Sequence, residues 1–572
     1  MVPRYRDAAI FRTKATLLQV KRALNNGFES DLRRWPTAES LSHQPILAES
    51  RTPLWTAEKA SEILLAAGKI HNLRLAIRRL NGIEVPPNHV LSFWKQIGRS
   101  SRLKGYVPGR ELREGCLIAN IGGGLCQLSN ALYETAVKAG LEIIERHAHS
   151  KVIPGSLAER GLDATVFWNY VDLRFRSQRA FRVEAFLTSE SLVVRFRGEV
   201  RSQPSHRSIA VATPDVIENC SSCERTSCFR HSPTPHTQFG RSAYLVDEYW
   251  PEFDRYISRA RRESDLICLP IDGRRFRKPN YSWTISGFSK VKQFPSFVLH
   301  RSFQMRKLSA QGAARQQALL AFNERLAGHF ASSLNYETTH VVVMQSLLPF
   351  LWLGGHLGGR TFDVFMTRLP MTVLHQTLDE ASKLHPESRT LTDFRADSLL
   401  VNAETEALRQ ARKIITPHSM VAANFPHNAE LIEWSTPAAP AQFKTPFASK
   451  LRLIFPAPTV ARKGAYELRA ALQGSDAQLT ILGPVLEDHD FWRGVRVEKA
   501  SKTEAWFARG NAVVLPAFVE HRPARLLDAI ARGIPVIAST ACGLENVKGV
   551  TTVKAGDVES LRSAINGLRL NG

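Results

Sequence analysis

Residues 513–540 read VVLPAFVEHRPARLLDAIARGIPVIAST, which is the pattern of a strand, a loop, a helix and a second strand. The apolar run at 513–515 is short enough for a buried strand, and apolar residues recur at helical spacing within 525–532. Gly533 ends this helix before the next apolar run begins. The order predicts an α/β unit with Glu520 at the carboxyl end of the first strand. Open parallel sheets bind ligands at that edge, so Glu520 is a candidate ligand contact.

A second acidic residue, Asp528, follows Glu520 with seven residues between them. One acid is expected on the loop and the other in the helix, where both could face one small ligand. The segment resembles the E-x7-E segment of retaining glycosyltransferases of the GT-B fold, family 4 type. The resemblance implies that Glu520 contacts the donor sugar, as a catalytic residue, and that Asp528, in place of a glutamate, contacts the nucleotide ribose.

The sequence upstream, at 451–472, resembles the strand, loop and helix of the same family. An arginine usually precedes the family's lysine by about six residues, where this chain has Ala457, so Arg462 is the expected substitute. Basic side chains and a helix N-terminus can stabilise a departing diphosphate without a metal. The positions that the resemblance assigns to the nucleotide-sugar donor, besides Asp528, are Arg462, Lys463, Gly464 and Gly483.

A different motif, IGGGLCQLSNALYETAVKAG, occupies 121–140. Its glycines come directly before Cys126, and the apolar spacing that follows is helical. Cys126 is therefore expected near a helix N-terminus, where unpaired N–H groups and the helix dipole favour a thiolate.

Two histidines and two aspartates follow this cysteine in the sequence. In one interpretation Cys126 is a nucleophile, His147 or His149 is its base, and Asp163 or Asp172 orients the imidazole. In a second, the same residues bind a ligand without chemistry. In a third, the glycines only permit a tight turn and the cysteine is a small buried apolar residue. The residues leave all three open.

These motifs, with the later GLDATV at 161–166, resemble the VanW family over roughly 70–200. The resemblance implies one compact α+β domain. Acyl transfer or hydrolysis on a cell-wall precursor would suit a nucleophilic cysteine there.

A cysteine cluster lies between the two regions, in a stretch rich in serine, proline and threonine. Two closely spaced pairs of soft ligands suit a tetrahedral zinc ion, and an iron–sulfur cluster is the other candidate. The alternative is a flexible linker with free thiols. The candidate metal ligands are Cys220, Cys223, Cys228 and His231.

Composition limits the remaining possibilities. The net charge of +23 is spread along the chain and no nucleic-acid motif accompanies it, so anionic ligands or an acidic membrane surface, in peripheral contact, are favoured over nucleic acid. No apolar run is long enough to span a membrane and no secretory signal is readable, which predicts a cytoplasmic protein. The odd count of 7 cysteines argues against a disulfide framework.

The chain is thus expected to be α/β, with an α+β VanW-like domain followed by two Rossmann-like halves of a GT-B fold. The expected function is transfer of a sugar from a nucleotide-sugar donor to an unknown acceptor, for which a cell-envelope precursor is one candidate. The alternatives are a non-catalytic binding protein with a degenerate GT-B half and a Cys126-dependent thiol enzyme. The expected segments are 1–60 (helical extension), 61–200 (VanW-like), 201–240 (cysteine-rich linker), 241–430 (acceptor side) and 445–572 (nucleotide-sugar side).

Overall fold

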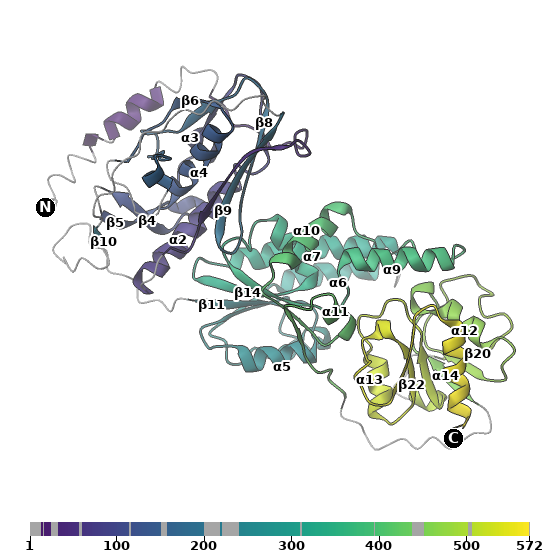
Figure 1. Ribbon diagram of the computed structural model, residues 1–572. Helices are drawn as coiled ribbons and strands as arrows, with labels where there is room; N and C mark the ends of the chain where they lie inside the picture. The colour runs from purple at the N-terminus through teal and green to yellow at the C-terminus, as the bar shows by residue number, and fades with distance from the viewer. Residues whose placement is uncertain are drawn as a thin grey trace. The chain divides into compact units, whose positions relative to one another are not determined.

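The computed structural model divides into two compact units (Figure 1). The first unit comprises Met1–Ser242 with Leu334–His340 and Gly354–Thr361, and the second comprises the rest. No helix among the described residues is both long enough and apolar enough to cross a bilayer. The structure describes residues 13–14, 16–24, 32–56, 60–113, 116–149, 157–199, 218–219, 240–308, 312–393, 395–437, 451–500 and 506–570.

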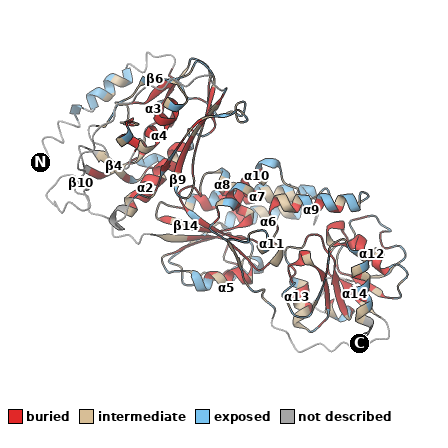
Figure 2. Cartoon of the chain, viewed as in Figure 1, coloured by how far each residue is buried: buried red, intermediate tan, exposed pale blue. Residues whose placement is uncertain are grey.

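The largest sheet of the first unit is antiparallel and has the strand order β1-β9-β8-β2. Its strands are β1 (Ile46–Pro53), β2 (Ile83–Val85), β8 (Phe181–Leu187) and β9 (Ser191–Gly198). Helices α2 (Ala60–Ile77) and α4 (Leu125–Lys138) pack on this sheet and on each other. Ile70, Leu132 and Phe196 belong to the resulting buried cluster, and Figure 2 shows α4 and β9 largely buried.

Two small sheets complete this unit. One has the order β10-β5-β4, and in it β4 and β5 form an antiparallel hairpin that leads directly into α4. The other has the order β3-β7-β6 and is antiparallel. The elements are β3 (Val90–Ser92), α3 (Phe93–Ile97), η1 (Arg102–Lys104), β4 (Pro108–Arg113), β5 (Cys116–Ile121), β6 (Glu142–Glu145), η2 (Leu157–Arg160), β7 (Arg174–Arg176) and β10 (Glu218–Asn219).

The N-terminal half of the second unit is built on a sheet of order β13-β12-β11-β14-β15-β16-β17. The pairs β11–β12, β12–β13, β15–β16 and β16–β17 are parallel. Figure 1 shows α5 on one face and α7 and α10 on the other. The strands are β11 (Arg241–Leu245), β12 (Leu266–Leu269), β13 (Lys290–Gln293), β14 (Thr338–Met344), β15 (Thr361–Phe365), β16 (Lys413–Thr416) and β17 (Ala429–Leu431). The helices are α5 (Pro251–Ala260), η3 (Pro279–Tyr281), α6 (Pro295–Arg306), α7 (Ala313–Ser333), η4 (Gln345–Leu347), α8 (Leu348–Leu353), α9 (Met371–Leu384), α10 (Ser398–Gln410) and α11 (Ser419–Ala423).

The C-terminal half of the second unit has a fully parallel sheet of order β20-β19-β18-β21-β22-β23. In chain order this is 3-2-1-4-5-6, the order of a doubly wound dinucleotide-binding sheet. In such sheets the ligand crevice lies at the switch point of the strand order, which here falls between β18 and β21. The elements are β18 (Arg452–Phe455), η5 (Ala461–Lys463), α12 (Ala465–Leu472), β19 (Gln478–Ile481), β20 (Arg496–Lys499), η6 (Trp506–Arg509), β21 (Ala512–Leu515), α13 (Ala524–Ala531), β22 (Val536–Ser539), η7 (Thr540–Cys542), β23 (Val550–Val553) and α14 (Val558–Leu570).

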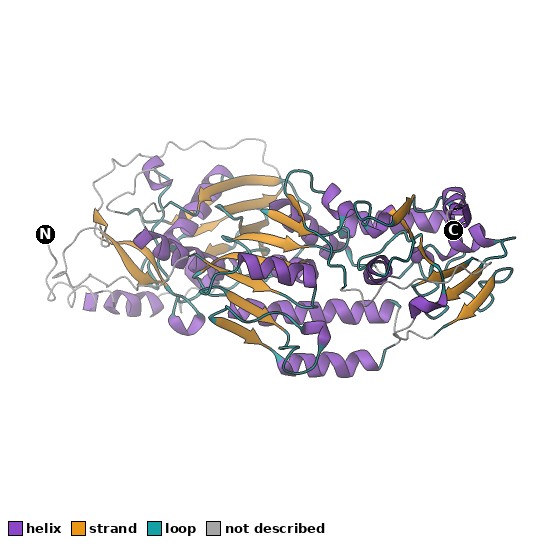
Figure 3. Ribbon diagram, turned by 90° about the horizontal axis from the view of Figure 1, so that it is seen from below, coloured by secondary structure: helices purple, strands orange, loops and turns teal. Residues whose placement is uncertain are grey.

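The fold class predicted from the sequence is confirmed. Figure 3 shows helices flanking the strands of each Rossmann-like sheet, and the strand, helix and strand expected within 513–540 are β21, α13 and β22. The predicted segment boundaries stay predictions. The sequence pattern gave no sign that 354–361 packs in the first unit, where Arg74 donates from Nε and Nη2 to the Gly358 carbonyl at 2.9 and 2.7 Å.

Candidate functional site

The crevice of the C-terminal half is built by glycines that let two loops approach. Gly464 has φ +74°, and a Cβ there would lie 2.0 Å from the Pro516 carbonyl oxygen in the loop after β21. Gly483 also lies against the loop after β18, because a Cβ there would be 2.5 Å from Pro458 Cα. Both positions exclude a side chain, so the predicted importance of these glycines has a steric basis.

Lys463 and Glu520 meet in this crevice. The Lys463 ammonium donates to Oε2 of Glu520 at 3.0 Å and to the Val519 carbonyl at 2.8 Å. The Arg522 N–H donates to the other carboxylate oxygen at 2.9 Å. Burial raises the pKa of Glu520, but the charge of Lys463 and these hydrogen bonds outweigh burial and leave that pKa below its usual value. The carboxylate is therefore ionised at neutral pH.

Further cations surround this pair. Burial lowers the pKa of His521 well below its usual value, and the positive charges of Lys463, Arg368 and Arg462 lower it further. Burial also lowers the pKa of Arg368, whose buried Nη2 finds no hydrogen-bond partner among the described residues. The crevice therefore concentrates positive charge, which favours an anionic ligand.

Arg525, on α13, reaches the loop after β18. Its guanidinium donates to the carbonyl of Pro456, the residue before the buried Ala457. Glu520 raises the pKa of Arg525, although burial lowers it more. A guanidinium thus lies beside the position where the sequence lacks the family's arginine. The expected substitute, Arg462, is also buried near Glu520 and Asp393, whose charges raise its pKa against the larger effect of burial.

Asp528 lies on α13, one helical turn before its partner. Its Oδ1 accepts a hydrogen bond from Arg532 Nε at 3.0 Å. The predicted contact of Asp528 with a ribose stays a prediction, and a ligand there would have to share or replace this ion pair.

Residues of the N-terminal half reach the same crevice. His418 is buried beside Glu520, with Nε2 3.1 Å from the Glu520 backbone oxygen. Burial lowers the pKa of His418, so it is a neutral imidazole. Arg522 pairs with Glu248 at 2.9 Å and lies 4.5 Å from the ring centre of Trp250. Loops that follow β11 and β16 therefore meet the loop that carries Glu520.

The second group of predicted residues lies in the first unit, at the start of α4. A Cβ on Gly123 would lie 2.2 Å from the Gly109 carbonyl oxygen of β4, and a Cβ on Gly124 would lie 2.1 Å from Lys69 Cγ on α2. Gly124 caps the helix with φ +99°. The glycines let the chain turn tightly from β5 into α4 and leave Cys126 in the first helical turn.

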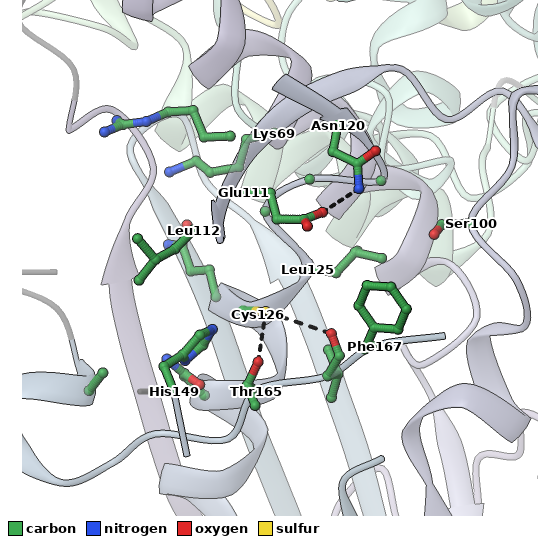
Figure 4. Close-up of a pocket in the computed structure, with 18 of the residues that line it drawn as sticks. Lys69, Ser100, Glu111, Leu112, Asn120, Leu125, Cys126, His149, Thr165 and Phe167 are labelled. Atoms are coloured by element: carbon green, nitrogen blue, oxygen red, sulfur yellow. Dashed lines mark hydrogen bonds between the residues drawn. The ribbon is translucent and has the colours of Figure 1, made fainter. Parts of the chain in front are cut away.

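Cys126, His149 and Asp163 lie together. His149 Nδ1 is 2.6 Å from Asp163 Oδ1, and the His149 backbone N–H donates to the same carboxylate. Cys126 Sγ is 3.8 Å from Thr165 Oγ1, and Figure 4 shows the His149 ring beside the thiol. Burial lowers the pKa of His149, but hydrogen bonds and charge interactions with Asp163 and Cys126 outweigh it and raise the pKa to about 10.

The other two candidates of the sequence lie elsewhere. His147 is half exposed, and its Nε2 is 3.4 Å from Glu145 Oε1. Asp172 is buried and accepts hydrogen bonds from Ser92 Oγ at 2.6 Å and Arg174 Nε at 3.0 Å. The structure therefore places His149 and Asp163 together near Cys126, whereas the side chains of His147 and Asp172 have other partners.

A cavity of about 520 Å³ opens over Cys126. Its lining includes His149, Thr165 and the backbone of the glycine turn. Lys69 also lines it and donates to the Leu54 carbonyl at 2.8 Å. Burial, and to a lesser extent the charge of Arg110, lowers the pKa of Lys69 to about 7.

The predicted metal ligands Cys220, Cys223, Cys228 and His231 lie outside the described residues. Within the described ranges no group of three or more His, Cys, Asp or Glu side chains could hold a metal ion.

The sequence did not indicate Lys69, Arg368 or Arg525 as site residues. Arg525 could have been found from its place, since it lies within the E-x7-E-like segment. Lys69 and Arg368 are distant in sequence from Cys126 and Glu520, and no local sequence pattern marks them as site residues.

Two regions of the chain, one containing each candidate site, match known protein families. Residues 68–197 match the family model described as VanW like protein, and 457–571 match the one described as Glycosyl transferases group 1. The chain is 36% identical over 108 residues to the uncharacterized protein YoaR of Bacillus subtilis (strain 168), covering 19% of this chain and 35% of that protein. It is 29% identical over 148 residues to the vancomycin B-type resistance protein VanW of Enterococcus faecalis (strain ATCC 700802 / V583), covering 25% of this chain and 53% of that protein. The chain thus spans about a third and about half of these curated relatives.

Solved structures with some similarity include a sucrose-phosphate synthase from Thermosynechococcus elongatus, with TM-score 0.38, 13% identity and coverage of 58% of this chain and 90% of that one. The lipopolysaccharide outer core galactosyltransferase WaaB has TM-score 0.34, 13% identity and coverage of 58% and 90%. The two resemblances read from the sequence are confirmed by the family models. Residues 68–197 form a VanW-like domain, and residues 457–571 form a glycosyl transferases group 1 domain.

Proposed function

We propose that the second unit is a glycosyltransferase that moves a sugar from a nucleotide-sugar donor to an acceptor. The observation that carries the proposal is the Lys463–Glu520 pair at the switch point of a 3-2-1-4-5-6 sheet, inside the segment that matches glycosyl transferases group 1. Ligands of doubly wound sheets bind at this point.

The diphosphate of the donor would lie among the cations of the crevice. When the bond between the sugar and the nucleotide breaks, the nucleoside diphosphate leaves and negative charge develops on it. Positive groups fixed in a water-poor site stabilise this charge. Lys463, Arg368 and Arg462 provide such groups. Arg525 would take the role of the arginine absent at Ala457, because its guanidinium already lies at the Pro456 carbonyl.

Glu520 would accept hydrogen bonds from hydroxyls of the donor sugar. Its carboxylate is ionised and is held by Lys463 and the Arg522 N–H, so it is oriented before the donor binds. Asp528 would contact the ribose once it shares its carboxylate between the ligand and Arg532. This assignment corresponds to the family 4 type of retaining enzyme.

The N-terminal half of the second unit would bind the acceptor. A cell-envelope precursor at an acidic membrane surface, reached from the cytoplasmic side, fits the net charge of +23. A zinc ion or iron–sulfur cluster on Cys220, Cys223, Cys228 and His231 remains a separate proposal. Metal analysis of the purified protein tests it, and absence of stoichiometric zinc and iron counts against it.

The test of glycosyl transfer is release of nucleoside diphosphate from UDP-, GDP- and ADP-sugars, together with calorimetric binding of the same donors. We expect one donor class to bind and turn over, and Glu520→Gln to lower kcat by roughly 100-fold or more with donor binding retained. Arg509→Gln is the matched control, because Arg509 is half exposed in the same half and pairs with Glu498 at 3.0 Å, away from the crevice residues named above. Binding without turnover would favour the non-catalytic alternative. The absence of both binding and turnover would refute the proposal.

A further inference from the structure

The cavity over Cys126 belongs to the first unit, and its residues form a second constellation suited to chemistry. We propose that Cys126, His149 and Asp163 form a thiol acyl-transfer site, and that its substrate is an amide or ester that carries a carboxylate. Cys126 is the nucleophile and His149 the acid and base, whereas Asp163 is a positioning residue.

Backbone hydrogen bonds hold His149 between Asp163 and Cys126. The Thr165 N–H donates to the His147 carbonyl at 2.8 Å, and Asp163 binds both the backbone N–H and Nδ1 of His149. The segments that carry the imidazole and the carboxylate are thereby fixed side by side. With Nδ1 occupied by Asp163, Nε2 is the ring nitrogen left for the thiol, which is the relation of base and orienting group in a nucleophilic triad.

The start of α4 supplies groups for a developing oxyanion. N–H groups in the first turn of a helix have no partner within the helix, and Leu125 and Cys126 occupy this turn. The glycine turn and both residues line the cavity. A carbonyl carbon next to Cys126 Sγ would place its oxygen toward these N–H groups, as an oxyanion hole requires.

The reaction then balances without an added reagent except water. The Cys126 thiolate attacks the carbonyl carbon and forms a C–S bond, while the carbonyl electrons move to the oxygen. As the oxygen electrons return, the C–N or C–O bond breaks and His149 gives its proton to the leaving amine or alcohol. Water then attacks the thioester and passes a proton to His149, the C–S bond breaks, and the carboxylic acid leaves.

The charge of the cavity defines the substrate class. Glu111 is the one carboxylate among the described lining residues, and it accepts a hydrogen bond from Asn120. The same lining contains an apolar part that includes Leu112, Leu125 and Phe167. An aliphatic acyl group with a free carboxylate would contact the apolar lining with its chain and the cationic lining with its carboxylate. The cationic lining residues are Arg51, Arg99, Arg110 and Arg160.

A buried structural cysteine would differ in accessibility. Cys268 and Cys542 are buried, and burial raises the pKa of each thiol to about 12. Cys126 is partly exposed to its cavity. The chain therefore carries two internal controls for a reactive thiol.

The first test alkylates the full-length protein with iodoacetate and, separately, with iodoacetamide, and follows each cysteine by peptide mass spectrometry. The two reagents differ in charge and little in size. We expect Cys126 to react while Cys268 and Cys542 do not, and the iodoacetate to iodoacetamide rate ratio at Cys126 to exceed that of free cysteine by about 10-fold. Arg99→Gln should lower this ratio. A Cys126 as inert as the two buried thiols, or a ratio equal to that of free cysteine, overturns the proposal without any variant.

The second test measures acyl transfer from mono-p-nitrophenyl succinate, which carries a carboxylate, and from neutral p-nitrophenyl acetate. The expected result is a succinyl adduct on Cys126, preference for the anionic ester, and loss of turnover by roughly 100-fold or more in Cys126→Ser and His149→Gln. His147→Gln is the matched control, because His147 is half exposed and pairs with Glu145 instead. Asp163→Asn should change the pH profile of the reaction, which a merely structural residue would not do. An adduct elsewhere, or equal loss in both histidine variants, overturns the proposal.

Discussion

Nδ1 of His149 lies 2.6 Å from Oδ1 of Asp163, and the backbone N–H of His149 donates to the same carboxylate. The two contacts together fix the position and the orientation of the ring. An imidazole held in this way can serve Cys126 with no reorganisation of its own, which is how fixed groups lower a barrier.

The first prediction concerns Asp163→Asn and pH. Wild-type His149 keeps its proton up to a pKa of about 10, because Asp163 and Cys126 outweigh the effect of burial. Arg146 donates to the Asp163 backbone oxygen, and Arg160 lines the same cavity. Loss of the carboxylate lowers the His149 pKa, so the alkaline limb of succinyl ester turnover should move to lower pH by more than about one pH unit. An unmoved limb would mean that Asp163 has no electrostatic role.

The second prediction concerns the buried amine of Lys69. Its pKa in the folded protein is about 7, below the ordinary 10.5. Below pH 7 the amine is charged in both the folded and the unfolded protein, so its burial lowers stability the most. Between pH 7 and 10.5 the folded protein releases the proton while the unfolded protein keeps it, so the loss of stability declines as pH rises. Lys69→Met should therefore raise stability by up to several kcal/mol in acid, with a gain that shrinks as pH rises to 10.5. Urea unfolding at pH 6 and pH 9 measures both, and a gain independent of pH would contradict the cause given.

Local pattern was sufficient to predict part of both sites. Glu520 was predicted from its place at the carboxyl end of a strand and Lys463 from the family resemblance, and the parallel pairing of β18 and β21 brings both to one sheet edge. Cys126 was predictable from the glycines before it. Each of these residues owes its position to its own strand–turn–helix unit.

The remaining site residues depend on contacts that no local pattern encodes. Arg525 reaches Pro456, which is 69 positions away, and Lys69 lies on a helix that precedes Cys126 by a whole hairpin. The choice of His149 over His147 depends on the two contacts of His149, from its ring and its backbone N–H, with Asp163. Both histidines are equally plausible partners of Cys126 in the sequence, and only the tertiary structure shows which of them contacts Asp163.

The third prediction compares two glycines with nearly the same positive φ. Gly464 has φ +74° and Gly474 has φ +76°, but a Cβ on Gly464 would lie 2.0 Å from the Pro516 carbonyl oxygen, while nothing lies within 4 Å of one on Gly474. Gly474→Ala should cost about 1 kcal/mol, the cost of a left-handed backbone alone. Gly464→Ala should cost several kcal/mol more and weaken donor binding, because the two loops of the crevice must separate. Thermal unfolding of both variants checks this, and equal losses would show that the loops are not in contact.

The fourth prediction tests whether Arg525 replaces the arginine absent at Ala457. Removing a guanidinium that binds a diphosphate should weaken donor binding by about 2 to 3 kcal/mol, which is roughly 30- to 150-fold in Kd. Arg525→Ala should show this loss by calorimetry, while Arg509→Gln, on the surface of the same half, should show none. The double variant Arg525→Ala/Ala457→Arg then returns a guanidinium to the loop from the other side, so donor affinity should recover in part. Because Ala457 is buried, the double variant must first unfold cooperatively at a temperature near that of Arg525→Ala. A folded double variant with no recovery would mean that Arg525 acts through the packing of α13 and not through its charge at the diphosphate.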